Sequence, residues 1–151
     1  MNQLKPHALW VGHADDGRDF RSVFDFGIRA IVQVALEESP IPSPRELIYL
    51  RFPLLDGAGN NRAVLRQAVS AVTQLFQANI PMLVCCGAGM SRAPLIAAAA
   101  MTLSGTLHWD EALALVARHR PLDLSPPLVG DVRSILEELA KSQEGRIPSK
   151  K

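Results

Sequence analysis

The fold is decided by Val84-Cys85-Cys86-Gly87-Ala88-Gly89-Met90-Ser91-Arg92-Ala93-Pro94, a run that joins an apolar segment to an alanine-rich one. The apolar residues before the run predict a buried strand, and the alanines after it predict a buried helix. Glycines between them let consecutive backbone N–H groups turn inward, and the start of the helix adds the positive end of its dipole. The run therefore predicts an anion-binding loop.

The side chains of this loop indicate that the anion is a phosphate group and that the loop can react with it. A guanidinium in the loop binds two phosphate oxygens side by side, which an ammonium group cannot do. A cysteine at the bottom of the loop lies in positive potential, which favours the nucleophilic thiolate. We therefore predict Cys86 as the nucleophile and Arg92 as the phosphate clamp. The predicted phosphate-binding residues are Gly87, Ala88, Gly89, Met90, Ser91 and Arg92.

The spacing Cys-x5-Arg in a strand–loop–helix resembles the signature of the protein tyrosine phosphatases, in particular their dual-specificity branch. The resemblance runs from about residue 9 to about residue 139 and covers four further segments: Leu9–Gly12, Arg29–Ala35, Leu54–Asp56 and Arg118–Pro121. The first two look like the opening strands of the family, the third like its acid loop and the fourth like the helix end after the phosphate loop. The resemblance implies one α/β domain with a mostly parallel twisted sheet and helices on both faces.

The resemblance also implies an activity. It is that of a cysteine-dependent phosphatase acting on phosphotyrosine, and also on phosphoserine or phosphothreonine, through a phosphocysteine and with no metal or other cofactor. Asp56 takes the role of the acid that protonates the leaving oxygen and then activates water. Asp56-Gly57 is also an ordinary turn dipeptide, so a loop-shaping role stays open. Three rival acids lie where the resemblance assigns none: Asp15, Asp16 and Asp19. The implied partner is a phosphorylated protein or a small phosphomonoester.

Three positions depart from the family pattern. Cys85 stands where the family usually has histidine, and Ala93 stands where it has a serine or threonine that helps the thiolate leave. Pro126-Pro127 replaces a Pro-Asn pair whose asparagine supports the loop. These departures predict a slow enzyme in which breakdown of the phosphocysteine limits turnover.

Two other classes of protein remain open on the sequence alone. A phosphate-reading module would use the same loop without turnover, and the three departures are in its favour. A rhodanese-type sulfurtransferase also places a cysteine in a strand–loop–helix, but it needs no acid at Asp56. A separate hypothesis is that Cys85 resolves a sulfenic acid on Cys86; the alternative, which we favour, is that Cys85 only packs as a small hydrophobe.

Composition is that of a globular protein. The 151 residues are 48% hydrophobic and 21% charged with a net charge of +1, which implies no nucleic-acid binding. No stretch approaches the ~20 apolar residues needed to cross a bilayer, so no membrane partner is expected. We expect one domain over residues 1–140 and a disordered tail over residues 141–151. The two cysteines are adjacent, which excludes a disulfide framework and favours a reducing, cytoplasmic location. The oligomeric state is not fixed by these features.

Apolar periodicity predicts the remaining elements. Strands are expected at Ile48–Phe52 and Pro81–Cys85. Helices are expected at about Arg62–Ala78, capped by Asn60 or Asn61, and at Arg92–Ser104, Trp109–Arg118 and Gly130–Ala140. The alternation of strands and helices independently predicts a parallel sheet whose ligands bind at the carboxyl ends of the strands.

Overall fold

A computed structural model describes residues 1–146 of the chain. Within them a five-stranded sheet has the order β1-β2-β5-β3-β4. Its strands are β1 (Asn2–Gln3), β2 (Leu9–His13), β3 (Ala30–Gln33), β4 (Ile48–Arg51) and β5 (Met82–Cys86). The helices are α1 (Phe20–Asp25), α2 (Arg62–Gln77), α3 (Arg92–Leu103), α4 (Trp109–His119) and α5 (Pro126–Glu144), with a 3-10 turn at Asp16–Arg18.

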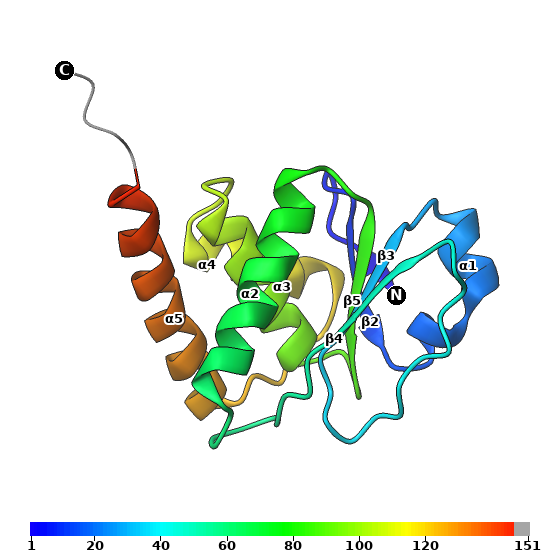
Figure 1. The fold of residues 1–151 in the computed structure, drawn as a ribbon, viewed down its shortest axis with the longest axis horizontal. Helices are drawn as coiled ribbons and strands as arrows, with labels where there is room; N and C mark the ends of the chain where they lie inside the picture. Colours follow the sequence, from blue (N-terminus) through cyan, green and yellow to red (C-terminus); the bar gives the residue numbers. More distant parts are fainter. Residues whose placement is uncertain (147–151) are drawn as a thin grey trace.

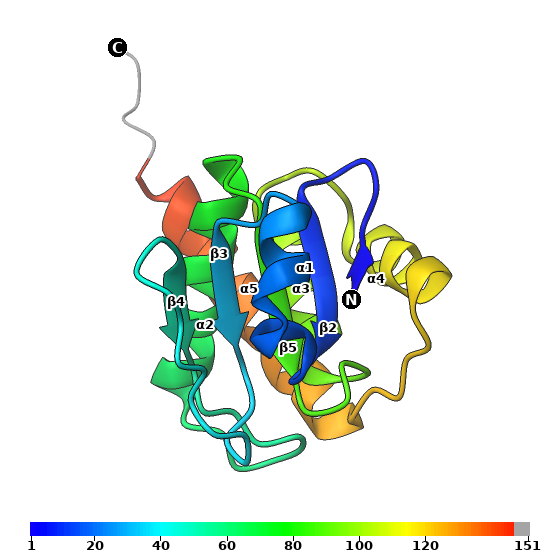
Figure 2. The same ribbon diagram turned by 90° about the vertical axis from the view of Figure 1, so that its right-hand side faces the viewer.

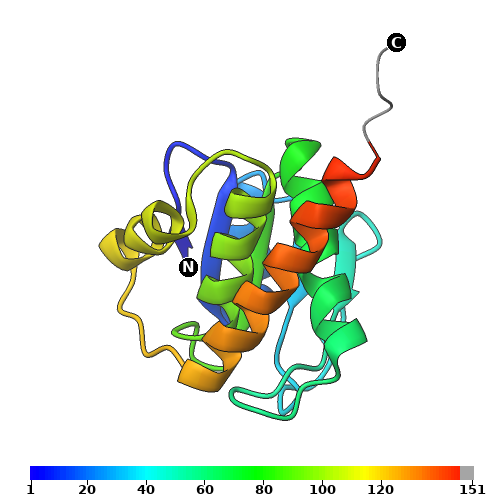
Figure 3. The ribbon, with the colours of Figure 1, turned by 90° about the vertical axis from the view of Figure 1, so that its left-hand side faces the viewer.

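The sheet is mostly parallel, as predicted. β5 pairs in parallel with β2 and β3, and β3 pairs in parallel with β4, while β1 runs antiparallel to β2. Helices cover both faces unevenly: α1 lies on one face, and the other four helices lie on the opposite side (Figures 1 and 3). All residues of β5 are buried, as expected for a central strand covered on both faces.

Alternating side chains divide the interior of the protein between the two faces of the sheet. Val84 and Cys86 of β5 belong to the larger core cluster, which includes the buried residues of α2, α3 and α5. Leu83 and Cys85 belong to a smaller cluster with Val23 of α1. Since consecutive side chains of a strand point to opposite faces, the two adjacent cysteines lie in different environments.

Three features of the fold differ from the expectations. β1 and α1 were not predicted, because a two-residue strand and a six-residue helix are too short to show apolar periodicity. α5 begins at Pro126 rather than Gly130, because proline suits the first turn of a helix, where its missing N–H costs nothing.

The expected tail at 141–151 is also wrong in its first residues. α5 continues to Glu144, because Lys, Gln and Glu are good helix formers, and Ser142 Oγ donates to Glu138 O at 3.0 Å. Residues 147–151 of the expected tail lie outside the described residues. No helix within residues 1–146 has the length and apolar character needed to cross a membrane.

Candidate active site

The residues predicted to act on phosphate gather at the carboxyl end of the parallel strands. Cys86 is the last residue of β5 and Arg92 is the first of α3, so residues 87–91 form the strand-to-helix loop. The loops that follow β3 and β4 reach the same end of the sheet, as does the segment before α5 (Figure 2). This edge is where open α/β sheets bind ligands.

Hydrogen bonds from outside the loop turn its carbonyl groups away from its centre. Gly87 O accepts from Ala14 N at 3.3 Å, and Met90 O accepts from Asp123 N at 2.9 Å. Arg120 donates to Ala88 O at 3.1 Å and to Gly89 O. Because the C=O and N–H of a trans peptide point in opposite directions, the N–H groups of residues 88–91 face the other way, toward the interior of the loop.

Gly89 occupies the tightest point of the loop. Its φ is +71°, and a Cβ added there would lie 2.6 Å from Gly12 O and 2.6 Å from the Arg120 guanidinium. Its N–H donates to Cys86 Sγ at 3.2 Å. A residue with a side chain would need both an unfavourable backbone conformation and a displaced β2. Glycine at position 89 thus lets the backbone come close enough to hydrogen-bond the Cys86 sulfur.

Arg92 is almost completely buried, with 6% of its side chain exposed, and two partners fix its orientation. Nη1 donates to Glu37 Oε2 at 2.6 Å and to Leu54 O at 2.9 Å, and Nη2 donates to Glu37 Oε1. The buried Nε has no partner within the described residues. Of the five guanidinium N–H groups, the pair left over is therefore Nε–H and one Nη2–H, on a single edge. That edge has the geometry for two oxygens of one phosphate.

The pair of Arg92 and Glu37 sets the charge on both groups. Hydrogen bonds from Arg92 hold the pKa of the Glu37 carboxyl below its ordinary value. Burial alone lowers the pKa of Arg92, but hydrogen bonds and charge from Glu37 more than offset it, so this pKa is raised. Cys86 and Asp56 line the same pocket as the guanidinium. Arg92 therefore stays cationic at the pH where a phosphate ester is a dianion.

One pocket of about 180 Å³ brings the predicted residues together. Its walls are Glu37, Asp56, Cys86, Ala88, Met90, Ser91, Arg92 and Asp123. The predicted binding residues Gly87 and Gly89 are not on its walls, although the Gly89 amide reaches Cys86. The pocket thus holds the predicted nucleophile, clamp and acid.

The loop that carries Asp56 is shaped by Asn60. Asn60 Oδ1 accepts from Leu55 N at 2.8 Å, and its Nδ2 donates to Leu55 O and Gly57 O. None of the rival acids lines the pocket. Asp16 accepts a hydrogen bond from His13 N at 3.0 Å, and Asp19 caps α1 by accepting from Ser22 N at 3.2 Å. Their positions favour Asp56 as the acid.

Cys85 is fully buried on the other face of the sheet from Cys86. Burial raises the pKa of the Cys85 thiol to about 12, with a smaller contribution from the neighbouring Cys86. Its Sγ would lie 3.1 Å from a Cβ added at Gly17, under the 3-10 turn. These surroundings favour the packing role of Cys85 over the resolving role.

Several residues of the site were missed from the sequence. Glu37 follows the predicted strand Arg29–Ala35 at its carboxyl end, and that position was a usable signal for it. Ser125 N donates to Ser91 Oγ at 3.2 Å, so the segment before α5 supports the loop although the family asparagine is absent. Asp123 lies in an irregular segment that no periodic pattern marks. Arg120 lies in the segment Arg118–Pro121, which the resemblance marked as a helix end but not as part of the site.

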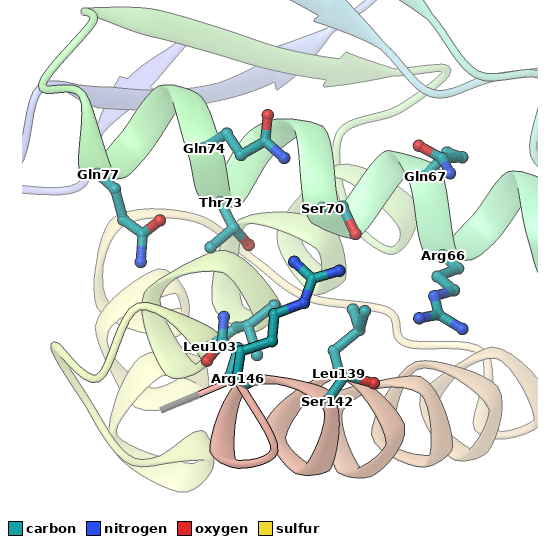
Figure 4. A pocket seen from close by; sticks show the side chains of 11 residues that line it. Arg66, Gln67, Ser70, Thr73, Gln74, Gln77, Leu103, Leu139, Ser142 and Arg146 are labelled. Carbon is teal, nitrogen blue, oxygen red and sulfur yellow. The ribbon is translucent and has the colours of Figure 1, made fainter. Parts of the chain in front are cut away.

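A larger hollow of about 360 Å³ lies between α2 and α5 (Figure 4). Its walls carry glutamine, serine and arginine side chains, including Gln74, Ser142 and Arg146, but neither cysteine. The nucleophile and the phosphate loop are therefore not part of it, and the smaller pocket at Cys86 is the candidate active site.

Known proteins share this architecture. No family model matches the chain. Zebrafish dual specificity protein phosphatase 22-B is 30% identical over 122 residues, which are 80% of this chain and 65% of that protein. The crystal structure of human DUSP28 superposes with a TM-score of 0.76 at 22% identity, covering 97% of this chain and 99% of that one. The crystal structure of a mouse putative dual specificity phosphatase complexed with zinc tungstate superposes with a TM-score of 0.75 at 22% identity, covering 99% of this chain and 92% of that one.

The fold and the sequence similarity together point to one class of proteins. The chain has the fold of the dual-specificity-phosphatase-like proteins and is similar in sequence to one curated member of that class. The chain spans 65% of the length of this curated relative, which is less than two thirds. These likenesses favour a phosphatase over a sulfurtransferase.

Proposed function

We propose that this protein is a cysteine-dependent protein phosphatase that hydrolyses phosphotyrosine, and phosphoserine or phosphothreonine as well, through a phosphocysteine. The observation that carries the proposal is the free edge of Arg92, which lies in one pocket with Cys86 and Asp56. A buried guanidinium edge with no partner among residues 1–146 calls for an oxyanion. The adjacent sulfur supplies the nucleophile for it.

In the first step the Cys86 thiolate attacks phosphorus and forms an S–P bond while the bond from phosphorus to the ester oxygen breaks. The departing oxygen takes a proton from Asp56. The Arg92 edge and the amides of residues 88–91 stabilise the charge on the three equatorial oxygens. In the second step Asp56 accepts a proton from water, the water oxygen bonds to phosphorus, and the S–P bond breaks to release phosphate and the thiolate.

The Cys86 role is tested by hydrolysis of p-nitrophenyl phosphate with two matched variants. Cys86→Ser should abolish turnover, because a serine hydroxyl is not ionised at neutral pH. Cys85→Ser makes the same change in the same strand on the opposite face, and should retain turnover in the folded fraction. Equal activity of the two variants would contradict the proposal. Vanadate binding by the wild type without any turnover would favour the phosphate-reading module instead.

The Asp56 role is tested by changing the leaving group. Asp56→Asn should slow phenyl phosphate by about 10²- to 10⁴-fold, the usual contribution of a general acid, and p-nitrophenyl phosphate much less. The more acidic p-nitrophenol departs without a proton, which is why its ester is spared. A uniform loss with both esters would mean that Asp56 only shapes its loop.

The second step is tested at Ala93, a fully buried residue in the first turn of α3. We expect the wild type to release a burst of p-nitrophenol followed by a slow steady state. Ala93→Ser adds the hydroxyl that the family uses to help the thiolate leave, and it should speed the steady state with the burst unchanged. An unchanged slow phase would show that the missing hydroxyl is not limiting.

A further inference from the structure

The pocket at Cys86 contains one carboxylate that the proposed chemistry does not use. Three acids line it, Glu37, Asp56 and Asp123, against the single cation Arg92. Glu37 is already paired with Arg92, and Asp56 carries the proton in the proposed first step. Asp123 is exposed, and its side chain makes no hydrogen bond or ion pair within the described part of the chain.

The backbone around Asp123 is nonetheless fixed against the loop. Asp123 N donates to Met90 O at 2.9 Å, and two residues later Ser125 N donates to Ser91 Oγ at 3.2 Å. The carboxylate therefore starts from a main-chain atom bonded to the loop that holds the phosphate. It is held at the pocket wall by the fold and does not depend on a flexible connection.

The charges of the pocket make this position selective. Arg92 is engaged by Glu37, and the donated hydrogen bonds of Arg120 go to backbone carbonyls and to Asn2 Oδ1 at 2.9 Å. Neither arginine forms an ion pair with Asp123. A second negative group beside the phosphate would be repelled by Asp123, whereas a cation there would be attracted.

We propose that Asp123 is a specificity-determining residue that selects singly phosphorylated peptides with a lysine or arginine two positions from the phosphorylated residue. This inference rests on the proposed phosphatase function. A pocket of about 180 Å³ takes the phosphate and little more, so neighbouring residues of an extended peptide lie across its rim. In an extended peptide the side chains two positions before and after the phosphorylated residue lie on its face of the strand, about 6.6 Å along it, so a long cationic side chain there can reach a rim carboxylate.

The test uses three phosphotyrosine peptides that differ only at the two positions lying two residues before and two residues after the phosphotyrosine, which hold lysine, glutamine or glutamate. For the wild type we expect kcat/KM to fall in that order at low ionic strength. Asp123→Asn should lower kcat/KM for the lysine peptide and raise it for the glutamate peptide. The ratio between them should shrink by about two- to fivefold, the scale of an exposed charge pair. Asp25→Asn on α1, across the sheet, is the matched control and should leave the ratio unchanged.

An unchanged ratio in Asp123→Asn would overturn the inference. If that unchanged ratio came with an equal loss on all three peptides, Asp123 would act on the reaction itself. A separate measurement tests the proposed function itself: if it is wrong, the wild type will not hydrolyse p-nitrophenyl phosphate. In that case peptide affinities measured with Cys86→Ser, and with Cys86→Ser combined with Asp123→Asn, give the same comparison. An identical order of affinities in both proteins would reject the role of Asp123.

Discussion

Replacing Gly89 by alanine tests whether close packing of the phosphate loop against β2 shapes the site. The chain offers a matched control in Gly105, which follows α3. Gly89 has φ +71° and Gly105 has φ +76°, so alanine meets the same unfavourable backbone conformation at both. An added Cβ at Gly105 meets nothing within 4 Å, whereas at Gly89 it lies 2.6 Å from Gly12 O.

The two variants should therefore share one cost and differ in another. The left-handed conformation costs an alanine about 1–2 kcal/mol, so we expect Gly105→Ala to lose about that much stability and to keep its activity. In Gly89→Ala the loop must also move away from β2, which displaces the Gly89 amide from Cys86 Sγ. A misplacement approaching 1 Å in a catalytic group costs on the order of 10²-fold in rate. We expect kcat/KM to fall by about that factor.

Urea unfolding gives the stability of each variant, and p-nitrophenyl phosphate hydrolysis with vanadate inhibition gives the state of the loop. The expected result is a larger stability loss in Gly89→Ala than in Gly105→Ala, with weakened vanadate inhibition only in Gly89→Ala. If Gly89→Ala binds vanadate as well as Gly105→Ala does, the close approach to Gly12 does not shape the loop, and the reasoning fails.

Three further predictions concern the surroundings of the site. Because burial raises the pKa of Cys85 to about 12, iodoacetamide at mildly alkaline pH should leave Cys85 unmodified in the folded protein and alkylate it in concentrated guanidinium chloride; peptide mass spectrometry would detect any exception. Asn61→Ala removes the cap of α2, in which Asn61 Oδ1 accepts at 2.9 and 3.2 Å, and should cost about 1 kcal/mol in urea unfolding, whereas Asn60→Ala should mainly reduce activity. Arg92 lowers the pKa of Glu37, so the stabilising contribution of the Glu37 carboxylate is present above the ordinary pKa of 4.5 and is lost as the pH falls through the lowered pKa. The difference in unfolding midpoint between wild type and Glu37→Gln should therefore shrink below that pH. A constant difference would argue against the pairing of Glu37 with Arg92.

Most of the fold could be predicted because its signals are local. The apolar run at β5 and the apolar periodicity of α2 each identify an element within a few residues, and the order of elements indicates a parallel sheet. The choice between Asn60 and Asn61 as the cap of α2 was beyond the sequence. Both side chains carry the same groups, and only the path of the chain assigns Asn61 to the helix and Asn60 to the Asp56 loop.

The residues of the candidate site were likewise predicted where the signal was local and missed where it depended on packing. Cys86 and Arg92 belong to one continuous motif, so their placement in one loop follows from spacing. Glu37 contacts Arg92 across 55 positions, and Arg120 contacts Gly89 across 31. Contacts between distant positions depend on how the elements pack, and a single sequence carries no periodic sign of them. Asp123 adds a further difficulty, because an acidic residue in an irregular segment is usually only solvated.

The outward-turned carbonyls of the loop have a consequence for its isolated sequence. A peptide spanning residues 84–94 contains the nucleophile, the guanidinium and every amide proposed to meet the anion. It lacks Ala14, Arg120 and Asp123, whose donors turn its peptide planes, so in water those amides would be oriented at random. Affinity for oxyanions should therefore be acquired only when distant parts of the polypeptide come together. On heating, it should disappear as soon as the 120–125 segment detaches, while the sheet is still intact.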